Sequence, residues 1–151
     1  MYDLVNETGF NLEKSKEYIL FIEIILDGFS FSVVSPSDNK LLAFKKKPLE
    51  PGDEKLVAKH FKEWIDSNDI FQNSFKTIRI ILFQDKFTIV PDKFISEELK
   101  NTIPSLLFSP GYEGFKITEN PIESSDSKLL FTIKQDLEVV LNKKFGEYKL
   151  V

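Results

Sequence analysis

Apolar and polar residues alternate through the first third of the chain in a pattern that predicts a β-hairpin. Residues 18–26 and 29–35 are rich in Ile, Phe and Val, and the dipeptide Asp27-Gly28 stands between them. Asp and Gly tolerate the positive φ angles that a two-residue hairpin turn needs. We therefore expect two antiparallel strands joined at this dipeptide.

This turn also predicts which residues of the two strands lie opposite each other. It places Ile24 opposite Phe31 and Glu23 opposite Ser32. Successive side chains of a strand point to opposite faces, so one face of the hairpin is apolar and the other mixed. The apolar face carries Leu20, Ile22, Ile24, Leu26, Phe29, Phe31 and Val33, and the mixed face carries Phe21, Glu23, Ile25, Ser30, Ser32 and Val34.

The pattern after the hairpin predicts a third strand and a helix. Turn residues at 36–39 lead into a strand over 40–47. Apolar residues then recur at helical spacing over 53–66, with Asp53 as the N-cap. The expected buried stripe consists of Leu56, Val57, His60, Phe61, Trp64 and Ile65.

Further strands and helices follow this helix. Residues 77–83 are β-branched and apolar with little alternation, which is typical of an interior strand covered on both faces. A strand, helix, strand order predicts that this strand runs parallel to the first. After a tight turn at 84–86, residues 87–90 are expected to return as a strand. The remaining elements are expected to be a helix from Ser96 ending before Pro104, a loop over 104–127 with one strand near 115–118, a final strand over 128–133, and a final helix over 134–145 capped by Gly146.

Composition describes a packed domain behind a short lead-in. Of the 151 residues, 42% are hydrophobic and 29% charged, which is typical of a folded soluble chain. A chain of this length removes roughly 70% of its unfolded surface from water. We expect residues 1–16 to be a flexible lead-in, whose Phe10 and Leu12 dock on the domain, and 17–151 to form a single α/β domain.

Charge and cysteine content argue against several kinds of function. The net charge of -4 disfavours a nucleic-acid surface, because such surfaces neutralise phosphates with Lys and Arg. The absence of Cys removes disulfides, thiolate nucleophiles and sulfur-ligated zinc. No signal peptide is visible, and the apolar run over 19–26 is far shorter than the ~20 residues of a membrane-spanning helix. We expect a cytoplasmic protein without a membrane partner.

The element order resembles that of the ribonuclease H-like and actin-like ATPase group. The segments at 20–34, 78–90 and 130–145 are also similar in type, order and spacing to an uncharacterised Bacteroidetes family, domain of unknown function 3822. That resemblance implies an actin-like fold consisting of a three-stranded antiparallel meander, a crossover helix, a parallel strand and further helix and strand elements. Members of that family continue past the position of Val151, so the resemblance implies the N-terminal half of a longer architecture.

The same resemblance points to the first turn as a nucleotide site. Actin-like ATPases place a phosphate-binding turn between the first two strands, typically Asp-x-Gly followed by hydroxyl residues. Gly28 and Ser30 can take the glycine and hydroxyl places, but Leu26 stands where that motif has Asp, and the acid has moved to Asp27. Hairpin chemistry alone accounts for Asp27 and Gly28.

A metal site of the ribonuclease H-like kind needs several converging carboxylates. Glu23 is the acid of the first strand, and Asp85 follows the fourth strand. A third ligand would have to come from Glu63 or Asp66 on the first helix. The structural alternative is that Glu23 forms a polar cross-strand pair with Ser32.

The remaining polar features are expected to be structural. His60 lies in the apolar stripe without a second His, a Cys or an adjacent Ser, and is interpreted as a packing residue. The run Lys45-Lys46-Lys47 is interpreted as a solvated strand end.

These observations favour a non-enzymatic protein-interaction or assembly domain with a degenerate actin-like fold. This interpretation needs no cofactor, leaves the protein partner unknown, and leaves a homodimer as one arrangement to test. The loop over 104–127 is the first place where we expect a partner contact. The alternative is an ATP-binding protein that uses magnesium and whose site needs a second half or a second copy. A metal-dependent nuclease is a more distant alternative.

Overall fold

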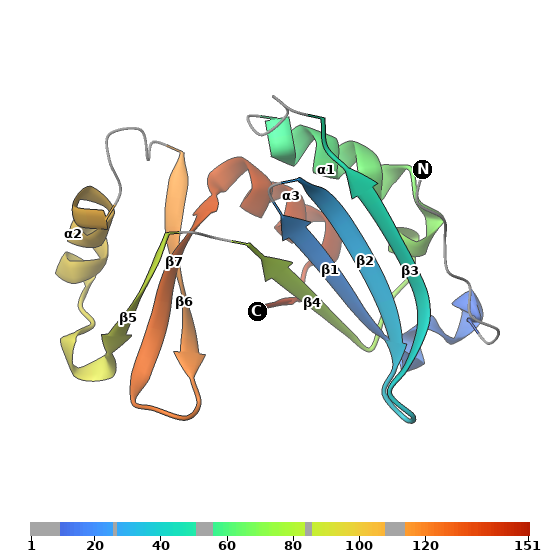
Figure 1. Ribbon diagram of the computed structural model, residues 1–151, viewed down its shortest axis with the longest axis horizontal. Helices are drawn as coiled ribbons and strands as arrows, with labels where there is room; N and C mark the ends of the chain where they lie inside the picture. Colours follow the sequence, from blue (N-terminus) through green and yellow to red (C-terminus); the bar gives the residue numbers. More distant parts are fainter. Residues whose placement is uncertain (1–9, 26, 51–55, 84–85, 108–113) are drawn as a thin grey trace. The chain divides into compact units, whose positions relative to one another are not determined.

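The computed structural model describes residues 10–25, 27–50, 56–83, 86–107 and 114–151. The chain divides into two compact units (Figure 1). The first unit contains the residues up to Phe83 and those from Asn142 onward, and the second runs from residue 84 to residue 141. Compact units can belong to one domain, so the single domain expected over 17–151 stays a prediction.

A five-stranded sheet is the centre of the first unit. The strand order is β3-β2-β1-β4-β8, with β1 antiparallel to β2 and parallel to β4. This arrangement confirms the predicted antiparallel meander, the crossover helix and the parallel fourth strand. The elements of this unit are η1 (Leu12–Glu17), β1 (Ile19–Ile25), β2 (Gly28–Ser35), β3 (Lys40–Pro48), α1 (Val57–Asp66), η3 (Asp69–Gln72), β4 (Thr77–Leu82) and β8 (Lys149–Leu150).

The predicted register of the hairpin is wrong by two residues. Ile24 pairs with Phe29 and Glu23 pairs with Ser30, because Gly28 is the first residue of β2 rather than part of the turn. A shift by an even number of residues keeps every side chain on its predicted face. The separation into an apolar and a mixed face therefore remains correct.

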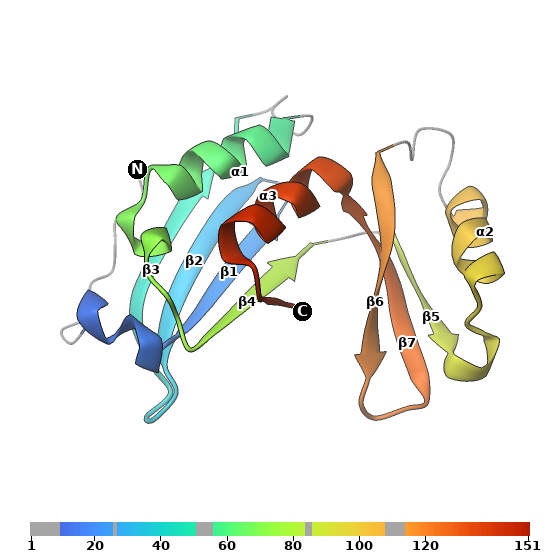
Figure 2. The same ribbon diagram turned by 180° about the vertical axis from the view of Figure 1, so that it is seen from behind.

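The core of the first unit lies between the apolar face of the hairpin and α1 (Figures 1 and 2). Phe29 lies 5.2 Å from Phe61 and 5.6 Å from Trp64, measured between ring centroids. Phe61, Trp64 and Ile65 are buried, as predicted, but Leu56 is 48% exposed. Ala58 is buried as well, so the packed stripe begins later than expected. The predicted N-cap Asp53 lies outside the described residues.

The expectation that β4 is covered on both faces is wrong. Ile80 is its buried residue, whereas Arg79 on the other face is exposed. Figures 1 and 2 show α1 on one face of the sheet, and within the described part of this unit no helix lies on the opposite face. That opposite face is the mixed face of the hairpin, continued across β4.

A short 3-10 helix precedes the first strand, within the stretch expected to be a lead-in. It is η1, and the side chain of Asn11 accepts a hydrogen bond of 2.9 Å from the Glu13 amide at its start. Phe10 lies 6.1 Å from the ring of Tyr18, which agrees with the expected docking of Phe10.

The second unit is built on a three-stranded antiparallel sheet with the order β5-β7-β6. The strand expected over 87–90 is present as β5, but it pairs with β7 instead of returning along β4. The tight turn expected at 84–86 falls largely on residues outside the described ranges. The elements of this unit are β5 (Phe87–Pro91), η4 (Asp92–Phe94), α2 (Glu97–Leu107), β6 (Phe115–Ile122), β7 (Ser127–Lys134) and the beginning of α3 (Gln135–Phe145).

The predicted loop over 104–127 is wrong in part: the strand expected near 115–118 is present as β6, but α2 extends to Leu107 and β6 extends to Ile122. The helix α2 starts as expected, since the Ser96 hydroxyl oxygen accepts a hydrogen bond of 3.1 Å from the Leu99 amide. It continues through Pro104, which removes one backbone donor without ending the helix. β6 includes Pro121 on an edge strand, where a missing amide is tolerated.

The end of the chain contains one strand that the sequence pattern did not indicate. α3 ends as predicted at Gly146, whose φ is 65° and whose amide donates to the Asn142 carbonyl at 3.1 Å. The next residues form β8, which adds to β4 as a parallel strand. β7 is therefore not the last strand. Among the described residues, no helix is long and apolar enough to cross a membrane.

Candidate functional site

The turn between β1 and β2 gathers most of the predicted site residues. Ligands of open α/β sheets bind beyond the carboxyl ends of parallel strands. At this end of β1, the Phe83 amide after β4 donates to the Ile24 carbonyl at 3.0 Å. Glu23, Asp27 and Ser30 lie here, so the topology places them where a ligand site is expected. Asp85 lies outside the described residues.

Ser30 is bonded to Glu23. The Ser30 hydroxyl donates to Oε2 of Glu23 at 2.5 Å, and Ser30 is 3% exposed. The contact follows from the register, because the two residues are direct cross-strand partners on the mixed face. A polar pair was expected for Glu23, but with Ser32, and the two-residue shift in register replaces Ser32 with Ser30.

Asp27 lies beside a lysine of the third strand. Its carboxylate is 3.6 Å from Nζ of Lys46, and its side chain is 73% exposed. The backbone carbonyl of Asp27 accepts a hydrogen bond of 2.9 Å from the Leu49 amide. The end of β3 therefore holds the turn through both the side chain and the backbone.

Gly28 is required by the approach of β3. A Cβ atom at this position would lie 2.3 Å from the Lys47 carbonyl oxygen and 2.9 Å from Cα of Pro48. Its φ of 153° is also one that residues with side chains rarely adopt. The positive φ expected at Gly28 is present, but the glycine also admits the close approach of β3 and belongs to β2 instead of the turn.

Together these contacts form a continuous polar row across three strands. Ser30 pairs with Glu23 on one side and with Lys46 on the other. The row contains a carboxylate, a hydroxyl and an ammonium group, and each has a partner within the chain. The charges and hydrogen-bonding groups of this row can therefore satisfy one another without a bound ligand.

The acids proposed as metal ligands are divided between the two faces of the sheet. Glu23 lies on the mixed face, whereas Glu63 and Asp66 belong to α1, which packs on the apolar face. Asp66 pairs with Lys62 at 2.5 Å, and this hydrogen bond lowers the pKa of Asp66 below its ordinary value. Within the described ranges, no three His, Asp or Glu residues lie close enough together to hold a metal ion. The pair Glu23 and Asp85 stays a prediction.

The lysine run of β3 is only in part the solvated strand end that was expected. Lys45 is half-buried and donates to Oδ1 of Asn68 at 2.5 Å, which ties β3 to the end of α1. Lys46 contacts Asp27 as described above. His60 is 21% exposed and lies 3.4 Å from Glu63, measured from Nδ1 to Oε2. That position agrees with the expected role at the edge of the helix stripe.

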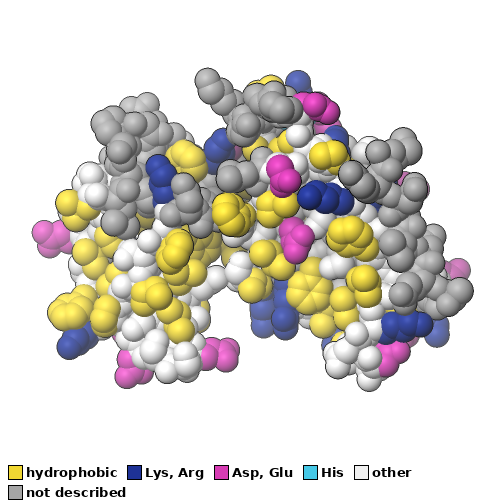
Figure 3. Space-filling model, viewed as in Figure 1, with side chains coloured by type: hydrophobic (Ala, Val, Ile, Leu, Met, Phe, Trp, Pro, Cys, Tyr) yellow, Lys and Arg dark blue, Asp and Glu magenta, His cyan; other side chains and the backbone are white. Residues whose placement is uncertain are grey.

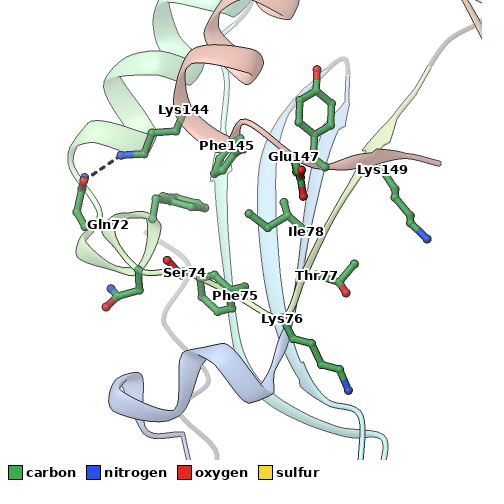
Figure 4. Close-up of a pocket in the computed structure, with 13 residues that line it drawn as sticks. Gln72, Ser74, Phe75, Lys76, Thr77, Ile78, Lys144, Phe145, Glu147 and Lys149 are labelled. Carbon is green, nitrogen blue, oxygen red and sulfur yellow. Dashed lines mark hydrogen bonds between the residues drawn. The ribbon is translucent and has the colours of Figure 1, made fainter.

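A pocket of about 770 Å³ lies in the first unit at the other end of the parallel strands (Figure 4). Its walls are Phe71–Ile78, which lead from η3 into β4, and residues 144–149, which lead from α3 into β8. Nζ of Lys144 donates to Oε1 of Gln72 at 3.0 Å, and the rings of Phe71 and Phe145 lie 6.2 Å apart. We call it the sheet-edge pocket.

The sequence pattern did not indicate this pocket. It depends on the pairing of β8 with β4, and β8 has two residues, too few to show a period. The mixture of Lys and aromatic residues over 143–149 was the signal available.

Comparisons with known proteins identify a family and a fold. The model of a family described as "Protein of unknown function (DUF3822)" matches residues 6–151. A crystal structure from Bacteroides thetaiotaomicron, of a protein with actin-like ATPase fold and unknown function, matches with a TM-score of 0.80 at 22% identity. The match covers 93% of this chain and 54% of that one, so this chain spans about half the length of that protein. The first unit's sheet and crossover helix are therefore those of an actin-like fold.

Two further solved structures are more distant. One is the cytoplasmic domain of EpsL, an inner membrane component of the type II secretion system of Vibrio cholerae, at 12% identity and a TM-score of 0.45. It is covered over 55% of its length by 89% of this chain. The other is a PilM-PilN type IV pilus biogenesis complex, at 14% identity and a TM-score of 0.45, with 88% of this chain and 46% of that chain covered. No curated protein matches this sequence.

Proposed function

This chain belongs to the DUF3822 family of proteins of unknown function, and we propose that it is a non-enzymatic protein-interaction or assembly domain on an actin-like fold. The observation that supports the proposal most strongly is that the polar groups at the turn between β1 and β2 already have partners within the chain. Ser30 donates to Glu23, Asp27 faces Lys46, and Gly28 admits the backbone of β3.

A phosphate-binding turn works differently. It offers hydroxyl groups and backbone amides to the anion. A hydroxyl that already donates to a carboxylate would have to leave that acceptor, and the Glu23 carboxylate would then repel the incoming phosphate. Leu26 also stands where the phosphate motif of actin-like ATPases has Asp.

The mixed face of the sheet supplies a surface for a partner. Phe21, Ile25 and Phe44 are half-buried there, and no helix of the described part of this unit covers them. Figure 3 shows hydrophobic side chains gathered over this sheet, between lysines and acidic residues. Apolar groups that remain accessible on a sheet face are typical of interaction surfaces.

The alternative function is ATP binding, completed by a second half or by a second copy of the chain. The observation that favours it is the likeness to a protein with actin-like ATPase fold, of which this chain spans about half. In this alternative, Asp27, Gly28 and Ser30 contact the phosphates and magnesium accompanies the nucleotide.

Thermal unfolding with and without millimolar ATP and magnesium separates the two functions. The interaction domain is expected to show no rise in Tm, because only a ligand that prefers the folded state stabilises it. A ligand at about 100 times its Kd adds roughly 2.7 kcal/mol, which would raise the Tm by several degrees.

Variants show which residues bind ATP if the Tm does rise. A rise that disappears in Ser30→Ala and Asp27→Ala, and persists in Ser124→Ala, would establish the nucleotide site and overturn the proposal. Ser124 is a matched control because it is an exposed serine in the turn between β6 and β7.

A further inference from the structure

The sheet-edge pocket combines aromatic walls with a positive rim. Phe71, Phe75 and Phe145 contribute rings, and the charged residues of the lining are Lys76, Lys144, Lys149 and Glu147. The lining therefore contains three ammonium groups and one carboxylate, in a chain whose net charge is -4. The local charge is opposite in sign to that of the whole chain, which favours an anionic partner at this place.

A second cation, Arg79, lies next to Lys149 on the mixed face of the sheet, which is the face opposite to Ile78 and Ile80. Arg79 of β4 and Lys149 of β8 are cross-strand partners. Like charges in directly opposite positions destabilise a sheet. Arg79 contacts the Phe21 ring at 5.6 Å, and within the described ranges neither Arg79 nor Lys149 forms a salt bridge. The electrostatic repulsion between Arg79 and Lys149 would be reduced by a bound acidic partner.

Several lysines of the described chain are paired with carboxylates. Lys46, Lys62, Lys100, Lys116 and Lys128 each lie within salt-bridge distance of one. Other described lysines, such as Lys47 and Lys93, have no such pair among the described residues, so what distinguishes Lys76 and Lys149 is that both line one pocket.

The arrangement of the side chains indicates an extended ligand. Figure 4 shows Lys144 on one side of the pocket, directed toward Gln72, and Lys76 and Lys149 on the other side. Phe75, Phe145 and Ile78 lie between these cations. Carboxylates at several points along one segment match this spacing better than a single carboxylate does. A volume of about 770 Å³ also lies within the range of pockets that accept ligands.

We propose that the sheet-edge pocket binds a short acidic segment of a partner protein, whose aromatic or large aliphatic side chain enters among the phenylalanines. The carboxylates of that segment pair with Lys76 and Lys149, which line the pocket. β8 is the last strand in the order of its sheet, so an extended segment can approach along this edge. This inference rests on the proposed function and names the chemistry of the partner.

Fluorescence anisotropy with a labelled synthetic peptide tests the site. The probe is Glu-Phe-Glu-Glu-Leu-Glu, and the same peptide with Gln in place of each Glu is its neutral counterpart. The full chain is expected to bind the acidic probe, more weakly as salt rises, and to bind the neutral peptide at least about tenfold less tightly.

Charge-reversal variants assign the binding to this pocket. Lys149→Glu and Lys76→Glu are each expected to weaken binding about tenfold. Lys93→Glu is the matched control, because it makes the same charge change at an exposed lysine of the second unit, and it is expected to bind within about twofold of the natural chain. Lys149→Glu creates an opposite-charge pair with Arg79, so a loss of binding in this variant is not a loss of folding.

Three outcomes would overturn the assignment. They are equal binding of both peptides, equal binding by Lys149→Glu and the natural chain, and binding of 3-phenylpropionate as tight as that of the acidic peptide. The last outcome would indicate a small carboxylate ligand. If any of these occurs and ATP causes no rise in Tm, the site fails while the proposed function stands. An ATP-dependent rise that Ser30→Ala removes contradicts the proposed function whatever the peptide does.

Discussion

Gly28 illustrates how a neighbouring strand can require a residue that a turn also explains. Asp27-Gly28 suggested a two-residue turn, yet Gly28 pairs with Ile25 as the first residue of β2. Its missing side chain leaves room for the carbonyl of Lys47, 2.3 Å from where a Cβ would be. Asp27, by contrast, is 73% exposed and forms a long ion pair. The two residues of the dipeptide therefore differ in what they contribute to stability.

Alanine substitutions at these two positions are expected to separate their roles. Gly28→Ala is expected to lower the free energy of unfolding by about 2–4 kcal/mol, because the Cβ meets backbone atoms and φ becomes strained. Asp27→Ala is expected to change it by less than about 0.5 kcal/mol. Urea unfolding followed by the fluorescence of Trp64, the chain's single tryptophan, measures both. Equal effects of the two substitutions would contradict this account of Gly28.

At the scale of elements, an ion-pair network connects α2, β6 and β7 in the second unit. Glu119 of β6 lies 2.7 Å from Nζ of Lys128 and 2.9 Å from Nζ of Lys100. Hydrogen bonds from Lys128 and then Lys100 lower the pKa of Glu119, and the bond to Glu119 raises the pKa of Lys100. The network joins a helix to two strands of a small sheet.

The stability of the second unit is expected to fall in acid because of Glu119. A lowered folded pKa adds stability above the unfolded pKa, and that stability is lost as the pH falls through the folded value. Glu119→Gln is expected to reduce this loss of stability. The reduction is about 1 kcal/mol at most, because the side chains of Lys128 and Glu119 are 31% and 33% exposed and solvent screens their interaction. Far-UV circular dichroism during urea unfolding at neutral and acidic pH measures it. Glu123→Gln, at an exposed turn position, is the control, and an identical acid response of both variants would argue against the network.

At alkaline pH, the change of stability with pH has the opposite sign. The raised pKa of Lys100 adds stability below its unfolded value, which is lost as the pH rises through the folded value. The network therefore contributes its full stabilisation at pH values above the unfolded pKa of Glu119 and below the unfolded pKa of Lys100.

Local patterns predicted elements better than they predicted partners. The three opening strands, α1 and the parallel β4 were expected from alternation, turn residues and helical spacing, and the structure contains them. The pairing of β5 with β7 was not expected. It joins segments about 40 residues apart, and the periodicity within a segment does not show which distant strand it pairs with. Pro104 indicated a helix end, but the helix is held by its Ser96 cap and the buried Ile103 and continues.

The same limit applies to the candidate sites. Turn chemistry located Asp27 and Gly28, and the resemblance to actin-like ATPases pointed to Ser30, although the partner of Glu23 depended on the register. The sheet-edge pocket could not be located, because its two walls are about 70 residues apart and meet only when β8 joins β4.

At the scale of the whole molecule, the first unit is discontinuous in sequence. Its sheet begins before the second unit and receives β8 after it. The last residues also contribute to the core, because Phe145 contacts Phe71, and Phe71 contacts both Trp64 at 5.1 Å and Phe31 at 5.3 Å. The first unit therefore depends on residues that follow the second.

Removal of residues 142–151 is expected to destabilise the first unit by about 2–4 kcal/mol, which is the usual cost of losing a large core side chain. β4 would lose its outer neighbour and Phe71 would lose the ring of Phe145. The midpoint of urea unfolding reported by Trp64 fluorescence should decrease accordingly. Phe145→Ala in the full chain removes the ring and keeps β8, so the difference between the two variants gives the contribution of the strand. An unchanged midpoint after the truncation would mean that residues 10–83 fold without the end of the chain, and that β8 follows the sheet rather than completing it.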